Sequence, residues 1–492
     1  MIAKVCKELQ EKRDVRGNLI ILKEQLKEVD GKEEVLQWER QTQSLQSFLS
    51  AEDAKIRKNA ALALGLIGDE DSVDAIFEAY EKEDRLFVKS SYLTAMLSLD
   101  CRKYSGRLHE HYRRLCALVC SEEEKKHIRD EQKAMEELLF RLDGGKRHKF
   151  SGYDQESEVI LTTNPAYREI TARQIKSARP VLIPAGVKVK TPDVRELLAI
   201  RTFREMLFLT NANKHVEDTP EQIAKELLES GLLEWIAARH EGEPPFYFRI
   251  ERKKRMGEDT SDFIHRLARC IEEMSGRKLL NSTEHYEVEI RLNQNKDGTT
   301  FPCVKLYTIP MRRFSYRRRA VSTSMHPSVA ALLMQLAKPC LREGAQVLDP
   351  FCGVGTMLVE RDLLVPAGDM YGTDIFGEAI TGARENAKAA GMNINYIHRD
   401  AFDFTHKYLF DEIVTDMPDR GKKTREEQDR FYGQFFEKAA ELLKAGGVMV
   451  MYSDENGFVK KHLRLRSDFY LRKEYCIREK EGYYLFIIGF KG

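Results

Sequence analysis

The sequence predicts a multidomain protein with three unlike parts: an all-α region over residues 1–142, an α+β middle over 150–310, and an α/β domain of Rossmann-like topology over 320–492. Three observations support this prediction. The first part contains no proline and has the apolar spacing of helices. The second alternates helical segments with strands rich in β-branched and aromatic residues. The third contains a strand, a glycine turn and a helix in immediate succession.

Composition narrows the classes of protein that the chain can belong to. Its 492 residues suffice for about two to four domains. Because 80 basic residues face 79 acidic ones, no global field attracts a polyanion, and any nucleic-acid surface must be local. The nine cysteines form no Cys-x-x-Cys pair, which favours reduced thiols over disulfides or zinc. Without a signal peptide or a long apolar run, we expect a cytoplasmic protein that binds neither metal nor membrane.

The N-terminal part contains an internal repeat. Residues 56–64 align with residues 88–96, and residues 14–22 form a third, weaker copy. Helix pairs of such a period cannot bury their apolar faces alone, so they stack on one another. The segment resembles HEAT-like repeats, and an irregular helical bundle is the alternative interpretation. In either case we expect a contact surface for a protein partner, with no chemistry of its own.

Helix and strand patterns follow a definite order in the middle part. Before residue 219, we expect strands over 158–163, 181–183, 187–189 and 201–209, with a helix over 167–178. After it, we expect a helix over 220–233 with Thr219 as its N-cap, a strand over 246–250, a helix over 260–274 closed by Gly276, and strands over 286–292 and 303–307. The order resembles a THUMP-like domain preceded by a ferredoxin-like half. This resemblance implies a module that holds tRNA or rRNA.

The third part is organised around a glycine turn. A buried strand over residues 345–349 leads into a turn with Gly353 and Gly355, and an amphipathic helix follows from Thr356. Glycine is required where a Cβ would hold a ligand away from the backbone. The third glycine of the dinucleotide fingerprint is replaced by Leu358, which argues against NAD and leaves another adenosine-bearing ligand open.

Three further strands of this part end in an acid. The predicted strands end at Asp374, Asp400 and Asp416. Ligands of open α/β sheets bind at the carboxyl ends of the strands, so we expect these acids and Asp349 to line one site. The remaining predicted elements are helices over 328–337, 378–391 and 431–443 and strands over 448–452 and 483–490.

Two motifs of this part resemble the S-adenosylmethionine-dependent RNA guanine-N2 methyltransferases that carry THUMP domains. The motifs are residues 349–356 (DPFCGVGT) and residues 415–418 (TDMP). The resemblance implies a seven-stranded sheet, S-adenosyl-L-methionine as the cofactor and RNA as the partner, with tRNA favoured. In that family an aromatic residue usually follows the second motif, where this chain has Asp419 and Arg420.

The same resemblance implies cofactor contacts for particular residues. Asp349 would face the ammonium group of S-adenosyl-L-methionine, Asp374 the ribose hydroxyls, and Asp400 the adenine amino group. Each acid has an alternative role as an ordinary strand-end or helix-capping residue. The expected cofactor-binding residues are Asp349, Phe351, Cys352, Gly353, Gly355, Thr356, Asp374, Ile375, Asp400, Ala401 and Phe402.

Asp416, Met417 and Pro418 are the expected catalytic residues. The exocyclic amine of guanine is a poor nucleophile because its lone pair is delocalised into the ring. A carboxylate from Asp416 and the Met417 carbonyl can accept both N–H bonds and direct the lone pair at the methyl group. Pro418 restricts the backbone that orients this carbonyl. Phe431 or Tyr432 is a hypothetical stacking partner for the base.

Two basic runs are candidates for RNA contact. The first includes Lys253 and Lys254, at the end of a predicted strand. An arginine binds phosphate with two hydrogen bonds, and an aromatic ring stacks on an unpaired base. A solvated charged loop is the alternative for both runs. The second run interleaves aromatic residues with Arg312, Arg313, Arg317, Arg318 and Arg319.

These motifs together favour an RNA methyltransferase that forms N2-methylguanosine in tRNA. The alternatives are the same chemistry on rRNA, amino methylation of adenine in DNA, and a repeat-based RNA- or protein-binding protein whose methyltransferase domain is inactive.

Overall fold

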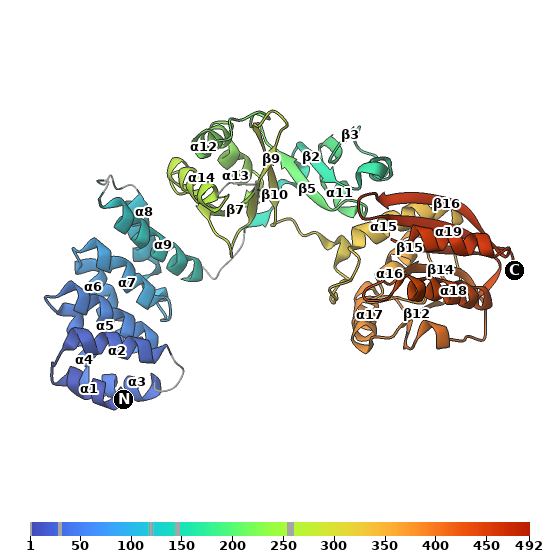
Figure 1. Ribbon diagram of the computed structural model, residues 1–492. Coiled ribbons are helices and arrows are strands. Elements are labelled where there is room, and N and C mark those ends of the chain that lie inside the picture. Colours follow the sequence, from blue (N-terminus) through green and yellow to red (C-terminus); the bar gives the residue numbers. More distant parts are fainter. Residues whose placement is uncertain are drawn as a thin grey trace. The chain divides into compact units, whose positions relative to one another are not determined.

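The computed structural model describes residues 2–27, 32–116, 118, 121, 123–142, 148–252 and 260–492 (Figure 1). The chain divides into two compact units. The first comprises Met1–His148, Pro244–Phe248 and Arg266–Glu287, and the second comprises Lys149–Glu243, Arg249–His265 and Val288–Gly492. All strand ends of the predicted site lie in the second unit.

The first unit is built mainly from the N-terminal helices. Over the described part of residues 2–142, the regular elements are α-helices and short 3-10 turns, which confirms the predicted helical character. The α-helices are α1 (Ile2–Gln10), α2 (Val15–Leu26), α3 (Lys32–Thr42), α4 (Ser44–Ser47), α5 (Ala54–Ile67), α6 (Val73–Lys82), α7 (Leu86–Met96), α8 (Ser105–Cys116) and α9 (Lys125–Leu142).

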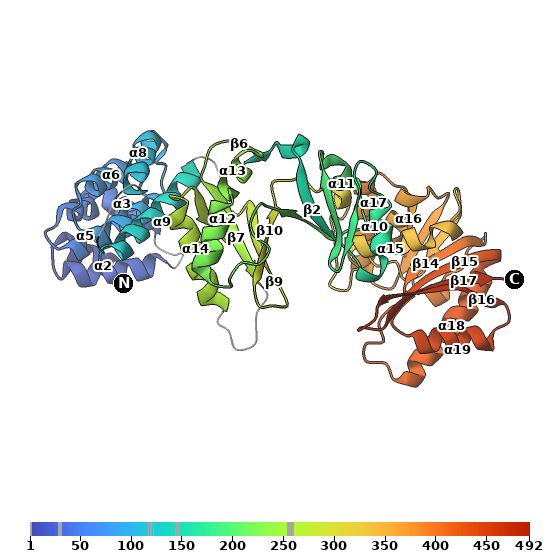
Figure 2. The ribbon, with the colours of Figure 1, turned by 90° about the horizontal axis from the view of Figure 1, so that it is seen from above.

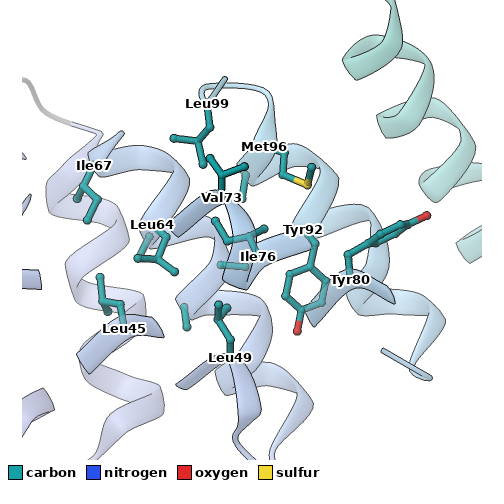
Figure 3. Packing of buried hydrophobic residues seen from close by; sticks show 14 of the residues in the cluster. Leu45, Leu49, Leu64, Ile67, Val73, Ile76, Tyr80, Tyr92, Met96 and Leu99 are labelled. Atoms are coloured by element: carbon teal, nitrogen blue, oxygen red, sulfur yellow. The ribbon is translucent and has the colours of Figure 1, made fainter. Parts of the chain in front are cut away.

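Helices α2, α5, α7 and α9 pack one against the next in chain order. The two clear copies of the repeat lie on α5 and α7, and the weaker copy lies on α2. Figure 3 shows Leu64, Ile76 and Tyr92, from α5, α6 and α7, in the shared core. Helices α5 and α7 approach closely at Gly65, where an added Cβ would lie 2.6 Å from the carbonyl oxygen of Ala95. Neighbouring repeat copies therefore share one core.

The middle part of the chain contains an eight-stranded sheet with the order β3-β4-β2-β5-β10-β9-β7-β8. Strand β5 pairs antiparallel with β10, which joins the early strands to the later hairpin. A separate two-stranded sheet pairs β1 (Lys149–Phe150) with β6 (His240–Glu241). The eight strands are β2 (Ser157–Thr162), β3 (Val181–Ile183), β4 (Gly186–Thr191), β5 (Glu205–Leu209), β7 (Phe246–Arg252), β8 (Leu279–Asn281), β9 (Val288–Gln294) and β10 (Thr300–Leu306).

Two elements before residue 219 are shorter than the sequence predicted. Helix α10 (Arg168–Ala172) ends early because the N–H groups of Lys176 and Ser177 donate to the Glu196 carboxylate instead of continuing a helix. The strand predicted over 201–209 is confined to β5, and Arg201 before it binds Glu360 of the C-terminal domain.

Later helices of the middle part follow the prediction more closely. Helix α14 (Thr260–Met274) has the predicted bounds. Thr219 caps α12 (Pro220–Glu229), with its hydroxyl accepting from the N–H of Gln222. The predicted helix over 220–233 is divided, because Gly231 adopts a φ of +84° and starts a new helix, α13 (Leu232–Ala237). A short helix, α11 (Arg195–Ala199), was not predicted.

A buried ion pair links the second unit's middle sheet to its C-terminal domain. Arg201 donates from Nε to Glu360 Oε2 at 2.8 Å and from Nη2 to Glu360 Oε1 at 2.7 Å. The hydroxyl of Tyr316 donates to the same Oε1 at 2.7 Å. Because Glu360 is buried, removing Arg201 would leave an uncompensated charge, so the link resists opening.

The C-terminal domain is a seven-stranded sheet with the order β13-β12-β11-β14-β15-β17-β16. The first five strands are parallel, and β17 runs antiparallel to both of its neighbours. The strands are β11 (Val347–Asp349), β12 (Met370–Asp374), β13 (Asn395–His398), β14 (Phe410–Asp416), β15 (Leu443–Ser453), β16 (Phe469–Arg478) and β17 (Tyr483–Phe490).

Helices cover both faces of this sheet, as Figure 2 shows. Alternate strand residues enter different cores, so Val347 packs with α15, α16 and α17 while Leu348 packs with α18 and α19. This is the three-layer arrangement expected of a Rossmann-like domain. The helices are α15 (Pro327–Ala337), α16 (Thr356–Leu364), α17 (Gly377–Ala390), α18 (Arg425–Leu442) and α19 (Asn456–Leu465).

Three features of this domain differ from the prediction. Helix α18 begins before Phe431 because Thr424 and Glu427 form a capping box. Strand β13 ends before Asp400, so this acid follows the strand. The sequence reading missed β16 and α19. Strand β16 lies at the sheet edge with most of its residues exposed or half-buried, so no clear apolar pattern marks it.

Candidate active site

The glycine turn follows strand β11 as predicted. Gly353 and Gly355 have φ angles of +51° and +81°, a region that favours glycine. A Cβ at Gly355 would lie 2.1 Å from the Tyr396 hydroxyl, so a side chain there has no room. At Gly353 a Cβ would meet nothing within 4 Å, so the turn presents open backbone on that side. The turn can therefore be approached closely by a ligand.

Asp349 lies beneath this turn and is fully buried. Its Oδ1 accepts from the Thr415 hydroxyl at 2.9 Å and from the N–H of Phe351 at 3.1 Å, whereas its Oδ2 has no partner. Burial raises the pKa of this carboxyl to about 8, and nearby Asp416 and Asp374 add to the effect. A hydrogen-bond donor or a cation placed beside Oδ2 would satisfy this oxygen and favour the ionised carboxylate.

Asp374 joins the end of β12 to the glycine turn. Its Oδ2 accepts from the N–H of Gly353 at 2.9 Å, and its Oδ1 accepts from the N–H of Phe376 at 2.8 Å. Each oxygen keeps a further lone pair, which a ribose hydroxyl could use. Ile375 is 57% exposed and Phe376 is 66% exposed, so two apolar side chains stand free beside the acid. Sequence reasoning missed Phe376, although it directly follows the strand-end residues.

The residues after β13 form a short capped turn. Asp400 is exposed, and its Oδ1 accepts from the N–H of Phe402 at 2.9 Å. Ala401 is buried beneath it. The Phe402 ring lies against Phe351 and Phe431, with ring centroids 6.4 and 5.4 Å apart. Asp400 thus fills the capping role that was its alternative, at the start of the 3-10 turn Ala401–Asp403.

Three buried polar atoms around the turn have no hydrogen-bond partner: Asp349 Oδ2, the Thr356 hydroxyl and the Tyr396 hydroxyl. Tyr396 was missed from sequence because its strand position predicts only a core residue. Cys352 is also buried, and burial raises the pKa of its thiol, so it is no nucleophile here. Buried polar groups in proteins usually have partners, so these three atoms are candidates for contact with a bound ligand or an ordered water.

Asp416 ends β14 beside this turn. The N–H of the next residue, Met417, donates to the Tyr452 carbonyl at 2.9 Å and fixes the backbone there. The Asp416 side chain is partly exposed. Burial raises the pKa of its carboxyl to about 7; the negative charges of Asp419 and Asp454 add to this, and Arg478 opposes it. A carboxyl with such a pKa can hold or release a proton near neutrality.

The two aromatic residues proposed to stack on the base differ in position. Tyr432 is fully buried, and its hydroxyl lies 2.6 Å from that of Ser453, so it cannot reach a substrate. That part of the hypothesis is wrong, because adjacent helix residues point to different faces. Phe431 is partly exposed and packs against Phe351 at a centroid distance of 5.6 Å.

The second basic run is divided between structural and exposed arginines. Arg313 donates to the carbonyls of Ile200, Phe203 and Arg204, and its guanidinium lies 3.6 Å from the Phe203 ring centroid. Burial lowers its pKa to about 10. This argues against its expected contact with RNA, since its donors face protein carbonyls.

The other arginines of the run leave more surface available. Arg312 and Arg318 are exposed, and Arg319 pairs with Glu385 at 2.8 Å. Arg317 is half-buried and donates weakly to the Ser324 carbonyl. Lys253 and Lys254 of the first run lie outside the described residues.

The described residues hold no group of three or more His, Cys, Asp or Glu side chains placed to bind a metal ion. Among the helices that the structure describes, none has the length and apolarity needed to span a membrane.

The reversed strand β17, the glycine turn after the central strand β11 and the acids at the strand ends define a seven-stranded Rossmann-like methyltransferase fold. Comparison with known proteins agrees. Residues 315–478 match the family described as UPF0020: RMKL-like, methyltransferase domain.

Several curated relatives are RNA guanine-N2 methyltransferases. The tRNA (guanine(10)-N2)-dimethyltransferase of Methanothermobacter thermautotrophicus is 30% identical over 156 residues, which cover 30% of this chain and 45% of that protein. The tRNA (guanine(6)-N2)-methyltransferase of Thermus thermophilus is 27% identical over 232 residues, 46% of this chain and 64% of that protein. The U6 snRNA (guanine-N(2))-methyltransferase THUMPD2 of Mus musculus is 29% identical over 31% of this chain and 28% of that protein. The chain thus matches less than two thirds of each relative.

Solved structures share the fold over a longer stretch. TrmN from Thermus thermophilus superposes with a TM-score of 0.52 and 22% identity, covering 68% of this chain and 100% of that chain. SMU.472 complexed with SAH has a TM-score of 0.52 and 12% identity, covering 69% and 98%.

Proposed function

We propose that the chain is an S-adenosyl-L-methionine-dependent RNA methyltransferase that forms N2-methylguanosine, with tRNA as its substrate. One observation carries the proposal: the partly exposed Asp416 carboxyl, with a pKa near 7, stands at the same sheet edge as a glycine turn surrounded by unsatisfied buried polar atoms. The guanine-N2 specificity of the relatives, two of which act on tRNA, supports the choice of base and RNA.

The residues around the glycine turn fit S-adenosyl-L-methionine. Its ammonium group would satisfy Asp349 Oδ2, and its ribose hydroxyls would donate to the Asp374 carboxylate. Exposed Ile375 and Phe376 would cover the adenine ring, and Asp400 would accept from its amino group. When bound, the cofactor supplies a methyl group already activated by a positive sulfur.

Asp416 then acts on the guanine amine. Its carboxylate and the Met417 carbonyl accept the two N–H bonds, which directs the nitrogen lone pair toward the methyl carbon. As the new N–C bond forms and the bond between the methyl carbon and sulfur breaks, the amine must lose a proton, and the Asp416 carboxylate can accept it because its pKa lies near 7. Pro418 limits the backbone freedom next to the Met417 carbonyl.

The remaining parts of the chain would hold substrate and partners. Exposed Arg312 and Arg318, with Arg317 and Arg319, would contact RNA phosphates beside the catalytic domain. The middle sheet would serve as a THUMP-like RNA-holding module with a ferredoxin-like half. The packed α2, α5, α7 and α9 would form a HEAT-like stack that binds a protein partner. We place the activity in the cytoplasm.

Transfer of labelled methyl to RNA tests this proposal. The purified chain is incubated with total RNA and tritiated S-adenosyl-L-methionine, and the digested nucleosides are separated. We expect label in N2-methylguanosine of the tRNA fraction, and at least about a hundredfold slower labelling with Asp416→Asn. Label in rRNA or U6 snRNA would change the substrate but keep the chemistry. Label only in DNA or protein, or cofactor binding without transfer, would reject the proposal.

A further inference from the structure

The chemistry proposed for Asp416 requires an aromatic surface for the target base. A base that leaves its stack loses stacking energy, which enzymes restore with aromatic side chains. Strand β15 lies next to β14, and Asp416 pairs in register with Tyr452. Strand β17 follows and runs in the opposite direction, so its first residue, Tyr483, lies at the sheet edge where β14 ends.

Tyr483 is held in place on two sides. Its ring stacks on Tyr452, with centroids 5.0 Å apart and planes 23° apart. Its hydroxyl donates to Asp419 Oδ1 at 2.9 Å. Tyr452 is only 3% exposed and forms a fixed backing, whereas Tyr483 is partly exposed. The stacking and the hydroxyl bond therefore fix the position of the partly exposed Tyr483 ring.

Asp419 and Arg478 complete this arrangement. Asp419 lies three positions beyond Asp416, in the segment that follows β14, so the hydroxyl bond connects the catalytic segment to β17. The guanidinium of Arg478 lies 5.6 Å from the Tyr483 ring centroid, on an exposed residue that can move. A planar cation opposite an aromatic ring can cover the second face of a base.

We infer that Tyr483 is the residue on which the target base stacks, and that Asp419 positions its ring while Arg478 covers the base from the other side. The inference rests on the proposed function, which supplies the base. The inference also gives Asp419 a role. Where the related enzymes usually have an aromatic residue, the Asp419 carboxylate holds the ring of Tyr483, which comes from a distant strand.

The pKa shifts of the two tyrosine hydroxyls agree with a position close to Asp416. Burial raises the pKa of the Tyr483 hydroxyl; Asp419, Asp454 and Asp416 raise it further. The Tyr452 hydroxyl shows the same direction, with Asp416 again among the causes. Asp416 is therefore near enough to both rings to act electrostatically on them.

Three variants and one control test the inference by steady-state methyl transfer to total tRNA and by calorimetric binding of S-adenosyl-L-methionine. Tyr483→Leu should lower kcat/KM for RNA about tenfold to a hundredfold, the range for one lost base–aromatic stack. Tyr483→Phe keeps the ring but loses the hydroxyl bond to Asp419, so it should raise the KM for RNA about threefold to tenfold. Asp419→Ala should raise the KM for RNA about threefold to tenfold. All should bind cofactor as the wild type does.

Tyr484→Leu is the matched control, because this neighbouring tyrosine points to the opposite face of β17 and should transfer methyl normally. Transcripts containing 6-thioguanosine supply a second readout, since irradiation should cross-link the modified base to Tyr483. Wild-type kcat/KM in Tyr483→Leu with normal cofactor binding overturns the inference. If Tyr483→Leu loses cofactor binding, an unchanged KM in Asp419→Ala, which alters only an exposed side chain, overturns it instead. A wild-type chain that methylates no guanosine defeats the proposed function itself.

Discussion

The pH dependence of methyl transfer follows from the Asp416 carboxyl. Its pKa is about 7, because burial and the neighbouring acids Asp419 and Asp454 disfavour the charged form. The ionised carboxylate is the form that accepts from the amine and takes its proton. Activity should therefore be full above pH 8 and be lost as pH falls through 7.

The size of the effect follows from the titration of one group. With a pKa of about 7, about one tenth of the carboxyl is ionised at pH 6 and about nine tenths at pH 8. The transfer rate with both substrates saturating should therefore rise about tenfold between these values. Asp416→Asn keeps the size of the side chain but cannot accept a proton, so its rate should fall about a hundredfold or more and no longer vary with pH.

Single-turnover transfer to tRNA, measured from pH 5.5 to 8.5 with a constant ionic strength, provides the assay. Saturating cofactor is needed so that Asp349 does not contribute a second titration. A wild-type rate that is flat over this range would refute the assignment. A pH-dependent Asp416→Asn variant would do the same, because the titrating group would then be another residue.

Three further predictions concern the cofactor site and stability. The pKa of Asp349 is raised to about 8, and a bound ammonium group favours its ionised form, so cofactor affinity should weaken as pH falls below 8. Calorimetry in two buffers should detect the proton that Asp349 releases on binding. An Asp349→Asn variant whose affinity depends equally on pH would contradict this prediction. Arg201→Leu should destabilise the second unit by about 3–5 kcal/mol in thermal melts, since it leaves the buried Glu360 carboxylate without its cation. An unchanged melt would show that the pair is dispensable. Gly65→Ala should destabilise the helical unit by about 1–3 kcal/mol, because the added methyl group pushes α5 away from α7. Gly106→Ala is the control and should not destabilise it, since a Cβ there meets nothing within 4 Å. Equal melting temperatures of the two variants would disprove the close approach of α5 and α7.

The sequence by itself determined the elements whose signals are local. Thr219 as a cap, the bounds of α14 and the strand β17 all follow from capping and periodicity within a few residues. It also determined that Asp349, Asp374 and Asp416 would gather near one edge, because parallel strands deliver their ends to the same side of a sheet.

Only the tertiary structure decided which of several similar side chains can reach a ligand. Arg313 and Arg318 belong to the same basic run of the sequence. Arg313 donates hydrogen bonds to three backbone carbonyls, whereas Arg318 is exposed. Tyr483 lies far from Asp416 along the chain, and strand order and register alone bring them to one edge. The burial of a side chain and its hydrogen-bond partners depend on contacts between distant segments, and no local pattern of residues carries that information.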